Sequence, residues 1–157
     1  MTDPSNALQS LQRELLRTGM QLRRGELDKD LYVYADAPDG QGRFTYVRLE
    51  GRTVTALVIF GVCEPIDGIP SCAIGYAVPE AYRNQGRGKE IVRAAITEMQ
   101  HIHRHPFYVE AIVGADNKPS QRVAEQVISD VPVAVTDHVS GLPAFQYVRR
   151  IEQPKAS

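Results

Sequence analysis

Two strongly apolar segments with a helical pattern between them place the tightest constraint on the fold of this chain. Residues 71–78 form an apolar run that stops at Pro79, and residues 107–113 form a second one. Apolar side chains recur at helical spacing between these runs, at Val92, Ala95, Ile96 and Met99. A strand, a helix over about 88–101 and a second strand in this order predict a parallel crossover within one sheet.

The residues before this unit predict a helix followed by antiparallel strands. Asp3 can cap a helix and Pro4 suits its first turn, so we expect a helix from about Asp3 to Arg24. Its predicted apolar face is formed by Leu8, Leu11, Leu15 and Leu22. Three segments rich in Val, Tyr, Thr, Phe and Ile, separated by glycine turns, predict a meander of strands at 31–35, 43–50 and 52–63. A loop over 64–70 follows.

The residues after the unit add a short helix over about 119–128 and two strands near 133–137 and 144–151. The predicted fold is therefore α/β (α+β), a mixed central sheet of about six to seven strands with helices on both faces. The chain has 157 residues, which is typical of one domain, and we expect residues 1–157 to form it.

Composition restricts the classes of function. The formal net charge of -1 provides no general basic field for nucleic acid or an anionic membrane. The first residues are polar and no apolar run approaches the ~20 residues of a membrane helix, so we expect a cytoplasmic protein. Cys63 and Cys72 lie in apolar runs without a metal-binding motif and are expected to be buried free thiols. The alternating histidines at 101, 103 and 105 lack a carboxylate to complete a ligand set, so we predict no metal.

The loop that opens the central helix carries the chemistry. It reads Arg83-Asn84-Gln85-Gly86-Arg87-Gly88 and follows a strand directly. Amides at a helix N-terminus are unpaired, the helix dipole there favours negative charge, and glycines let a phosphate approach the backbone. Arg83, Arg87 and Lys89 add positive charge. The loop therefore predicts a pyrophosphate or phosphate site, although it lacks the Gly-Lys-Ser/Thr of a Walker loop.

This segment resembles the central motif of the GNAT acetyltransferase superfamily, Arg/Gln-x-x-Gly-x-Gly/Ala, through Arg83, Gly86 and Gly88. The preceding residues 78–80 (Val-Pro-Glu) and the later residues 117–120 (Asn-Lys-Pro-Ser) are also similar to family patterns. The resemblance implies a GNAT-like sheet with splayed fourth and fifth strands and transfer of an acetyl group from acetyl-CoA, a cosubstrate, to a primary amine by direct attack.

The resemblance also implies which residues hold the cosubstrate. The pantetheine arm would pair with backbone groups of Tyr76, Ala77 and Val78. The amides from Arg83 through Gly88, together with Lys89, would hold the pyrophosphate; this stretch comprises Arg83, Asn84, Gln85, Gly86, Arg87 and Gly88. Asn117 would reach the pantetheine from the other side, with help from Ser120. Asn117 also suits a turn and helix cap, and both roles can hold.

The catalytic residues are less well defined by the sequence. Val78 is the candidate backbone donor for the oxyanion. Glu110 lies in an apolar strand, where burial would raise its pKa and suit it to act as a general base, although an outward-facing glutamate fits the same pattern. Many family members protonate the thiolate with a tyrosine seven residues after the asparagine, and this chain has Ala124 there. Tyr147 and Tyr108 are the remaining candidates for the acid.

The acceptor and the assembly stay open. One alternative is a catalytically weak acyl-CoA-binding sensor or partner protein, which the alanine at position 124 favours. Another is a toxin-type acetyltransferase acting on aminoacyl-tRNA, for which arginines 13, 17, 23, 24, 149 and 150 would supply the basic face. We otherwise expect a small-molecule or peptide amine acceptor and no membrane partner. The last strands could present an edge for a homodimer.

Overall fold

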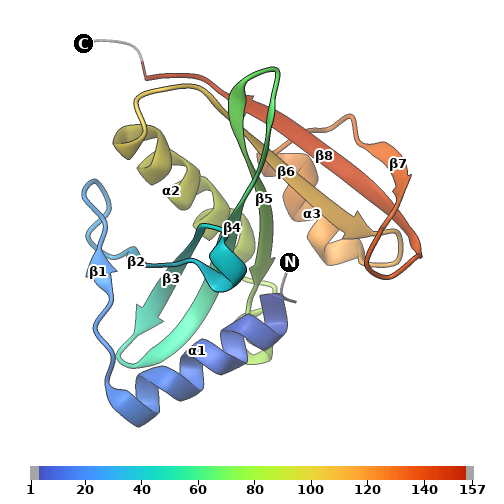
Figure 1. Cartoon of the computed structure of the whole chain (residues 1–157). Coiled ribbons are helices and arrows are strands. Elements are labelled where there is room, and N and C mark those ends of the chain that lie inside the picture. Colours follow the sequence, from blue (N-terminus) through green and yellow to red (C-terminus); the bar gives the residue numbers. More distant parts are fainter. Residues whose placement is uncertain (1–3, 155–157) are drawn as a thin grey trace.

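The computed structural model describes residues 4–154, which form an eight-stranded sheet with helices on both faces (Figure 1). The α-helices and strands in chain order are α1 (Pro4–Thr18), β1 (Arg23–Arg24), β2 (Tyr32–Asp36), β3 (Arg43–Glu50), β4 (Thr53–Ile66), β5 (Ile69–Ala77), α2 (Arg87–Ile102), β6 (Phe107–Gly114), α3 (Lys118–Val127), β7 (Val133–Thr136) and β8 (Pro143–Ile151). None of the helices within this range is long and apolar enough to span a membrane.

The strand order is β1-β2-β3-β4-β5-β6-β8-β7. Neighbouring strands are antiparallel except β5 and β6, which are parallel and are connected through α2. The predicted fold class and the predicted parallel crossover are therefore confirmed. The sheet exceeds the expected six to seven strands because Arg23 and Arg24 add a two-residue strand beside β2.

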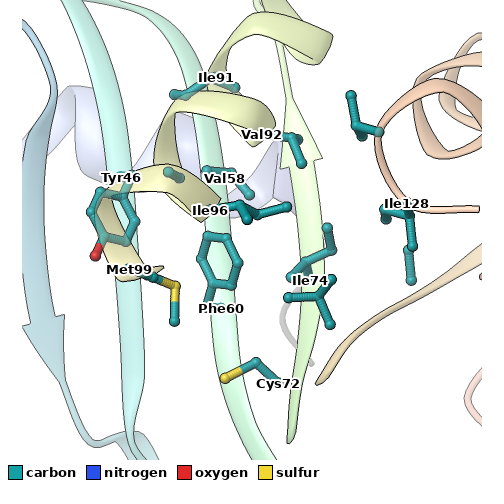
Figure 2. Close-up of a cluster of buried hydrophobic side chains, with 14 of the residues drawn as sticks. Tyr46, Val58, Phe60, Cys72, Ile74, Ile91, Val92, Ile96, Met99 and Ile128 are labelled. Atoms are coloured by element: carbon teal, nitrogen blue, oxygen red, sulfur yellow. The ribbon is translucent and has the colours of Figure 1, made fainter. Parts of the chain in front are cut away.

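Alternation along β4 builds the two layers of the core. Leu57 and Ile59 face α1, together with the buried Leu8 and Leu15 of that helix. Val58 and Phe60 point to the opposite face, where α2 packs on the sheet, as Figure 2 shows. Because side chains in a strand alternate between faces, one fully buried strand supports helices on both sides.

The first helix is shorter than predicted. Asp3, its expected cap, lies outside the described residues, and the helix ends at Thr18 instead of near Arg24. Gly19 adopts a left-handed conformation (φ +61°) and donates its amide to the carbonyl of Leu15, 3.1 Å away. A glycine in this conformation is a common helix stop, so Gly19 terminates α1.

The predicted loop over 64–70 is instead a hairpin that extends β4 and β5. Its turn is formed by Asp67 (φ +51°) and Gly68 (φ +78°), two successive left-handed residues. Such a two-residue turn matches the twist of antiparallel strands. The pairing is irregular between Cys63 and Ile66, and Pro65 lies within this irregular stretch, where a missing amide is tolerated.

The two cysteines differ in exposure. Both are free, as expected, and Cys72 is buried on the α2 face of the sheet. Cys63 is exposed, so the prediction that both are buried was wrong for this residue. It pairs with Ser71, the last regular pair before the irregular stretch that leads to the turn.

Pairing between β5 and β6 ends early, and this opens the sheet. Ser71, Cys72 and Ala73 pair with residues 108–110, but β5 continues to Ala77 and β6 to Gly114 without further paired residues between the two strands. Over the same stretch β5 remains paired with β4, and β6 with β8. The predicted splay of the fourth and fifth strands therefore corresponds to β5 and β6, with its vertex at Ala73 and Glu110.

A buried carboxylate connects α2 to the segment after β1. Glu98 is only 1% exposed and accepts the backbone amides of Glu26, Leu27 (3.1 Å) and Asp28 (3.3 Å). Gly25 is needed here because a Cβ would lie 2.5 Å from the carbonyl oxygen of Asp28. Three amides satisfy a charge that would otherwise be costly to bury.

Replacing this carboxylate tests its structural role. We expect Glu98→Ala to lower the free energy of unfolding by about 3 kcal/mol, because three buried amides lose their acceptor. Urea unfolding monitored by circular dichroism measures the change. Glu125→Ala, at an exposed helical position, is the matched control and should stay within about 0.5 kcal/mol of wild type. Equal stability of both variants would contradict the proposed role of Glu98.

Candidate active site

A cleft of about 800 Å³ lies where β5 and β6 part. Its walls are the C-terminal halves of these strands, the loop and first turn of α2, and the N-terminal half of α3. In parallel sheets the carboxyl ends of the strands form the usual ligand site, and here this is also the point where the sheet opens.

The loop before α2 presents backbone amides to this cleft. Asn84 (φ +61°) and Gly86 (φ +74°) are left-handed, and Gly86 is the N-cap of α2. Gly86 has no side chain to cap the helix, so the amides of the first turn lack an intrahelical acceptor. Alternating left-handed residues beside a helix N-terminus form a concave arrangement of amides that suits an anion.

Positive charge surrounds these amides. The cleft lining contains Arg83, Arg87, Lys89 and Arg122 and has no Asp or Glu among the described residues. Arg87 is held in place by Glu50 (3.1 Å) and by stacking of its guanidinium over the ring of Tyr82, 4.9 Å from the centroid. A cationic cleft that ends in helix amides is built to bind a polyanion.

The opposite wall is the first turn of α3. Asn117 is its N-cap, and its Oδ1 accepts the amide of Ser120 at 3.3 Å. The cap role that the sequence left open for Asn117 is therefore present, and the residue also lines the cleft. The amide nitrogen of the same side chain is not needed for the cap and can serve a ligand.

Tyr76 connects the two walls. Its ring extends from β5, and its hydroxyl donates to the carbonyl of Ser120 on α3 at 2.5 Å. Burial, followed by the neighbouring Tyr147, raises the pKa of Tyr76 above its usual value, so the hydroxyl stays protonated at neutral pH. The bond fixes α3 relative to β5 where β5 and β6 are no longer paired.

The structure places the predicted cofactor residues together. All of them except Gln85 line the cleft, which brings Tyr76, Ala77 and Val78 opposite Asn117 and Ser120. Gln85 instead accepts a hydrogen bond from Arg87 Nε at 3.2 Å. Residues more than 40 positions apart in the sequence thus meet in one cleft.

The predicted catalytic side chains lie outside the cleft lining, whereas Val78 lies within it. Tyr147 is 1% exposed and belongs to the core on the α2 and α3 face, where burial raises its pKa. Tyr108 pairs with Ser71 and lies beyond the vertex of the splay. Its hydrogen bond with Arg150 is the first cause of the raised pKa of that guanidinium.

Glu110 has a different position. It pairs with Ala73 at the vertex of the splay, and strand alternation directs it away from the buried Val109 and Ala111. Its Oε1 accepts from Gln146 Nε2 at 3.1 Å. Glu110 is half-buried, as the alternative prediction of an outward-facing glutamate allowed, and it lies on the face of the sheet opposite α2 and α3.

The histidines at the end of α2 do not gather into a ligand set. The rings of His103 and His105 lie 5.7 Å apart, and burial lowers the pKa of His103, with His105 as the second cause. His101 lies 3.7 Å from Glu26. Within residues 4–154 no group of three or more His, Cys, Asp or Glu side chains is placed to hold a metal ion.

The arginines proposed as a tRNA-binding face are dispersed. Because α1 ends at Thr18, Arg23 and Arg24 belong to β1 and not to the helix. Arg149 and Arg150 lie on β8, near the other edge of the sheet, and Arg149 donates to the carbonyl of Val127 at 3.0 Å. Of the four arginines in the predicted helix from Asp3 to Arg24, only Arg13 and Arg17 therefore lie on α1.

Sequence reasoning missed several residues of the cleft. Ile112 of β6 and Arg122, Val123 and Gln126 of α3 also line it. The three α3 residues share one side of the helix, so helical spacing after the Asn117 cap was the available signal. The position of Ile112 required knowledge of the splay, since an unbroken sheet would leave no cleft at that strand.

A splayed mixed sheet with an anion-binding loop at the head of its central helix defines the acyl-CoA-dependent transferase fold that the sequence resembled. A sequence model of the acetyltransferase (GNAT) domain family matches residues 12–127 of this chain. The chain therefore belongs to the GNAT acetyltransferase family, and the expected enzyme class is confirmed at the level of that family. A comparison with curated protein sequences finds no significant match.

Solved structures share this fold at low sequence identity. The acetyltransferase from Salmonella typhimurium that modifies the N-terminal serine of the ribosomal protein L7/L12 aligns at a TM-score of 0.57 and 17% identity, over 94% of this chain and 91% of that one. A GNAT acetyltransferase from Streptococcus pneumoniae aligns at 0.55 and 15%, over 96% of both chains. RimL, a ribosomal L7/L12 α-N-protein acetyltransferase in complex with coenzyme A, aligns at 0.54 and 19%, over 74% of this chain and 66% of that one. These similarities establish the fold.

The hydrogen bond from the Tyr76 hydroxyl to the carbonyl of Ser120 can be removed while the aromatic ring is kept. We expect Tyr76→Phe to lower the free energy of unfolding by about 1 kcal/mol and to speed amide exchange in the first turn of α3, since one buried hydrogen bond is lost. Tyr34→Phe, at a more exposed position on β2, is the control. Unchanged exchange in α3 would show that the hydroxyl does not hold this wall.

Proposed function

We propose that this protein transfers an acetyl group from acetyl-CoA to the primary amine of a peptide or protein. The observation that carries this proposal is the cationic amide cradle of residues 83–88, which leads directly into the gap between β5 and β6. The cleft suits a ligand that has an anionic group at one end and an extended arm containing amides at the other.

The two parts of the coenzyme fit two parts of the cleft. The pyrophosphate would bind the amides around Gly86, because the helix dipole and the left-handed backbone favour an anion there. The pantetheine arm would lie along the edge of β5 from Tyr76 to Val78, where β6 no longer pairs. Backbone groups at an unpaired strand edge can bind an extended ligand as they would an added strand.

The acceptor would approach from the face opposite α2 and α3. On that face α1 packs on β4 and β5, while Ile112 of β6 remains 45% exposed and Val148 of β8 38% exposed. Ile112 also lines the cleft, so the cleft opens onto this face. A partly apolar, uncovered sheet surface beside the thioester end suits an extended peptide better than a small polar amine.

Glu110 is the residue that we assign to proton transfer from the amine. It lies at the vertex of the splay on the acceptor face, and Gln146 fixes its carboxylate. The thioester supplies the activated acyl group. The neutral amine forms the new C–N bond as the C–S bond breaks, and its proton passes to Glu110 directly or through water.

Two further groups complete the proposed chemistry. The amide of Val78, at the end of β5, would stabilise negative charge that develops on the acyl oxygen. The thiolate takes up one proton as it leaves. Tyr147 is buried in the core, whereas the cleft lining itself includes Tyr76 and Tyr82.

The peptide acceptor also draws on the structural neighbours. Two of them are described as acetylating a ribosomal protein, one of them at its N-terminal serine. A peptide α-amine carries its proton with a pKa near ~8, lower than that of lysine, so less deprotonation is needed at neutral pH. We therefore propose the α-amine of a polypeptide as the first acceptor to assay.

Binding of acetyl-CoA tests the first half of the proposal. We expect wild type to bind acetyl-CoA with a Kd in the micromolar range, about -8 kcal/mol, and Gly86→Glu to lose at least about a hundredfold, because the new carboxylate occupies the anion site. Isothermal calorimetry measures both. Gly141→Glu is the matched control, since Gly141 has a similar left-handed φ of +73° against +74° and likewise open space around it. Absence of binding by folded wild type at millimolar acetyl-CoA would refute the proposal.

Replacement of Glu110 tests the second half. We expect Glu110→Gln to lower kcat about 10²- to 10³-fold with little change in the KM for acetyl-CoA, because the base is lost while the cleft is intact. Thiol release with a panel of N-terminal peptides measures the rates. Glu14→Gln, on the surface of α1, is the control. An unchanged kcat would exclude Glu110 as the base.

The same assays separate the alternative functions. A catalytically weak acyl-CoA sensor predicts acetyl-CoA binding without thiol release for any amine in the panel. A tRNA-directed enzyme predicts binding of aminoacyl-tRNA that weakens steeply with salt. The dispersed arginines favour the peptide acceptor over tRNA.

A further inference from the structure

The most exposed large apolar side chains of this protein gather at one edge of the sheet. Four of them are between 59% and 85% exposed, more than any other large apolar residue in the described chain: Val131, Val133, Val139 and Leu142. All four lie on β7, just before it or in the turn that joins it to β8. β7 is the last strand in the sheet order and lies at the periphery of the molecule (Figure 1). An exposed apolar cluster of this kind indicates a surface that another molecule covers.

The outer side of β7 presents unpaired backbone groups. The amide of Asp137, the residue after β7, donates to the carbonyl of Leu142 at 2.9 Å, toward β8. Backbone direction alternates along an antiparallel strand, so Val135 also points to β8, while Ala134 and Thr136 point away from it. Within residues 4–154 no strand pairs with this outer side. The amides and carbonyls of Ala134 and Thr136 can therefore bind a further strand.

The two edges of the sheet are protected to different degrees. At the other edge, β1 consists of Arg23 and Arg24 only, and both its short length and its charge discourage pairing with another chain. β7 reads Val-Ala-Val-Thr over residues 133–136, with no charge, no proline and no irregularity in its pairing with β8. Val and Thr also favour strands. β7 thus lacks the features by which soluble proteins keep an edge strand unpaired.

We propose that β7 pairs with β7 of a second copy of this chain, which joins the two sheets into one around a two-fold axis. Antiparallel pairing of two identical strands closes after two copies. Pairing between β7 and the two-residue β1 would leave part of the four-residue β7 uncovered and would continue from copy to copy as a filament. The edges therefore favour the symmetric contact. This assembly does not depend on the chemistry proposed above.

The outward backbone groups determine the register of this contact. Ala134 lies opposite Thr136 of the second copy, and the two residues exchange both of their backbone hydrogen bonds, which uses every outward amide and carbonyl of the strand. Val135 then lies on the two-fold axis opposite its own counterpart, with Cα atoms about 4.5 Å apart. Asp137 lies opposite Val133, so the carboxylates of the two copies do not face each other. The strand is complementary to itself in hydrogen bonding and in charge.

The two-fold axis places the same face of both copies on one side of the joined sheet. Residues that lie opposite each other in neighbouring strands share a face, and Val133 lies opposite Gln146, whose side chain binds Glu110. Val133 and Val135 therefore continue the face that carries Glu110, and β7 of the second copy extends it further. The dimer has one broad surface with two clefts instead of two separate faces.

Sedimentation velocity over a range of protein concentrations tests this contact. We expect wild type to form a reversible dimer with a Kd in the micromolar range, because a short edge buries less surface than a standard interface. Val135→Lys and Val135→Glu should each be monomeric, since like charges would face each other across the axis. An equimolar mixture of these two variants should dimerise again, because the charges that face each other are then opposite.

Ala134→Pro is a second variant, for the case that a charge at position 135 unfolds β7. Proline is tolerated on an edge strand where the missing amide points outward. It removes the outward amide of Ala134 in both copies, so we expect the dimer to weaken about tenfold or more. Val148→Lys is the matched control, because Val148 is also exposed but lies beyond the stretch of β8 that pairs with β7. It should dimerise like wild type, and circular dichroism verifies that each variant is folded.

Each outcome decides for or against the contact through β7. Monomeric variants and a dimeric mixture would establish both the edge and its register. A wild type that stays monomeric up to millimolar concentration would overturn the proposal. If folded Val135→Lys, Val135→Glu and Ala134→Pro dimerise as well as wild type, or if wild type forms species larger than a dimer, another surface associates and the proposal is wrong. If the mixture of folded monomeric variants stays monomeric, Val135 does not meet its own counterpart and the proposed register is wrong.

Discussion

The early end of pairing between β5 and β6 is the constraint on which the rest of this structure depends. A backbone edge in the interior of a sheet is normally satisfied by the next strand, and here that partner is missing beyond Ala73. The edge stays apart because β4 and β8 hold the two strands along their other sides. A sheet that opens in its centre obtains a ligand site without a separate domain, and it requires a ligand that can form backbone-like hydrogen bonds.

The two walls of the opening are stabilised by contacts that lie outside the sheet. The hydroxyl of Tyr76 bridges β5 and α3, and Val123 packs against the start of α2. On the other side of α2, Glu98 and Arg48 fix that helix to the segment after β1. The helix that presents the anion-binding amides is therefore held from both sides, which positions these amides before any ligand arrives. Preorganised donors of this kind lose little entropy on binding.

Some cationic side chains in and near the cleft pair with carboxylates, and others have no such partner among the described residues. Arg87 and Arg48 are paired with carboxylates, whereas Lys89 and Arg122 are unpaired in the part of the chain that the structure describes. Charged groups left unpaired beside a helix N-terminus make the cleft strongly attractive to a polyanion. The opposite face of the sheet has a different character, with the carboxylate of Glu110 beside exposed Ile112. An anionic donor and an amine acceptor would thus meet from opposite faces.

The sequence by itself determined the element types, the parallel crossover and the loop around Gly86, because apolar periodicity, glycine punctuation and a helix start are local signals. The predicted end of α1 and the predicted loop around Asp67 were wrong. Several glycines and prolines in these segments could each end a helix or a strand, and contacts with distant residues determine which of them does. Only the tertiary structure decided that Tyr147 is buried in the core, that Glu110 lies at the vertex of the splay and that Arg122 faces the cleft. Strand alternation fixes which residues share a face, but which face is covered depends on where each helix packs, and that follows from contacts between distant segments.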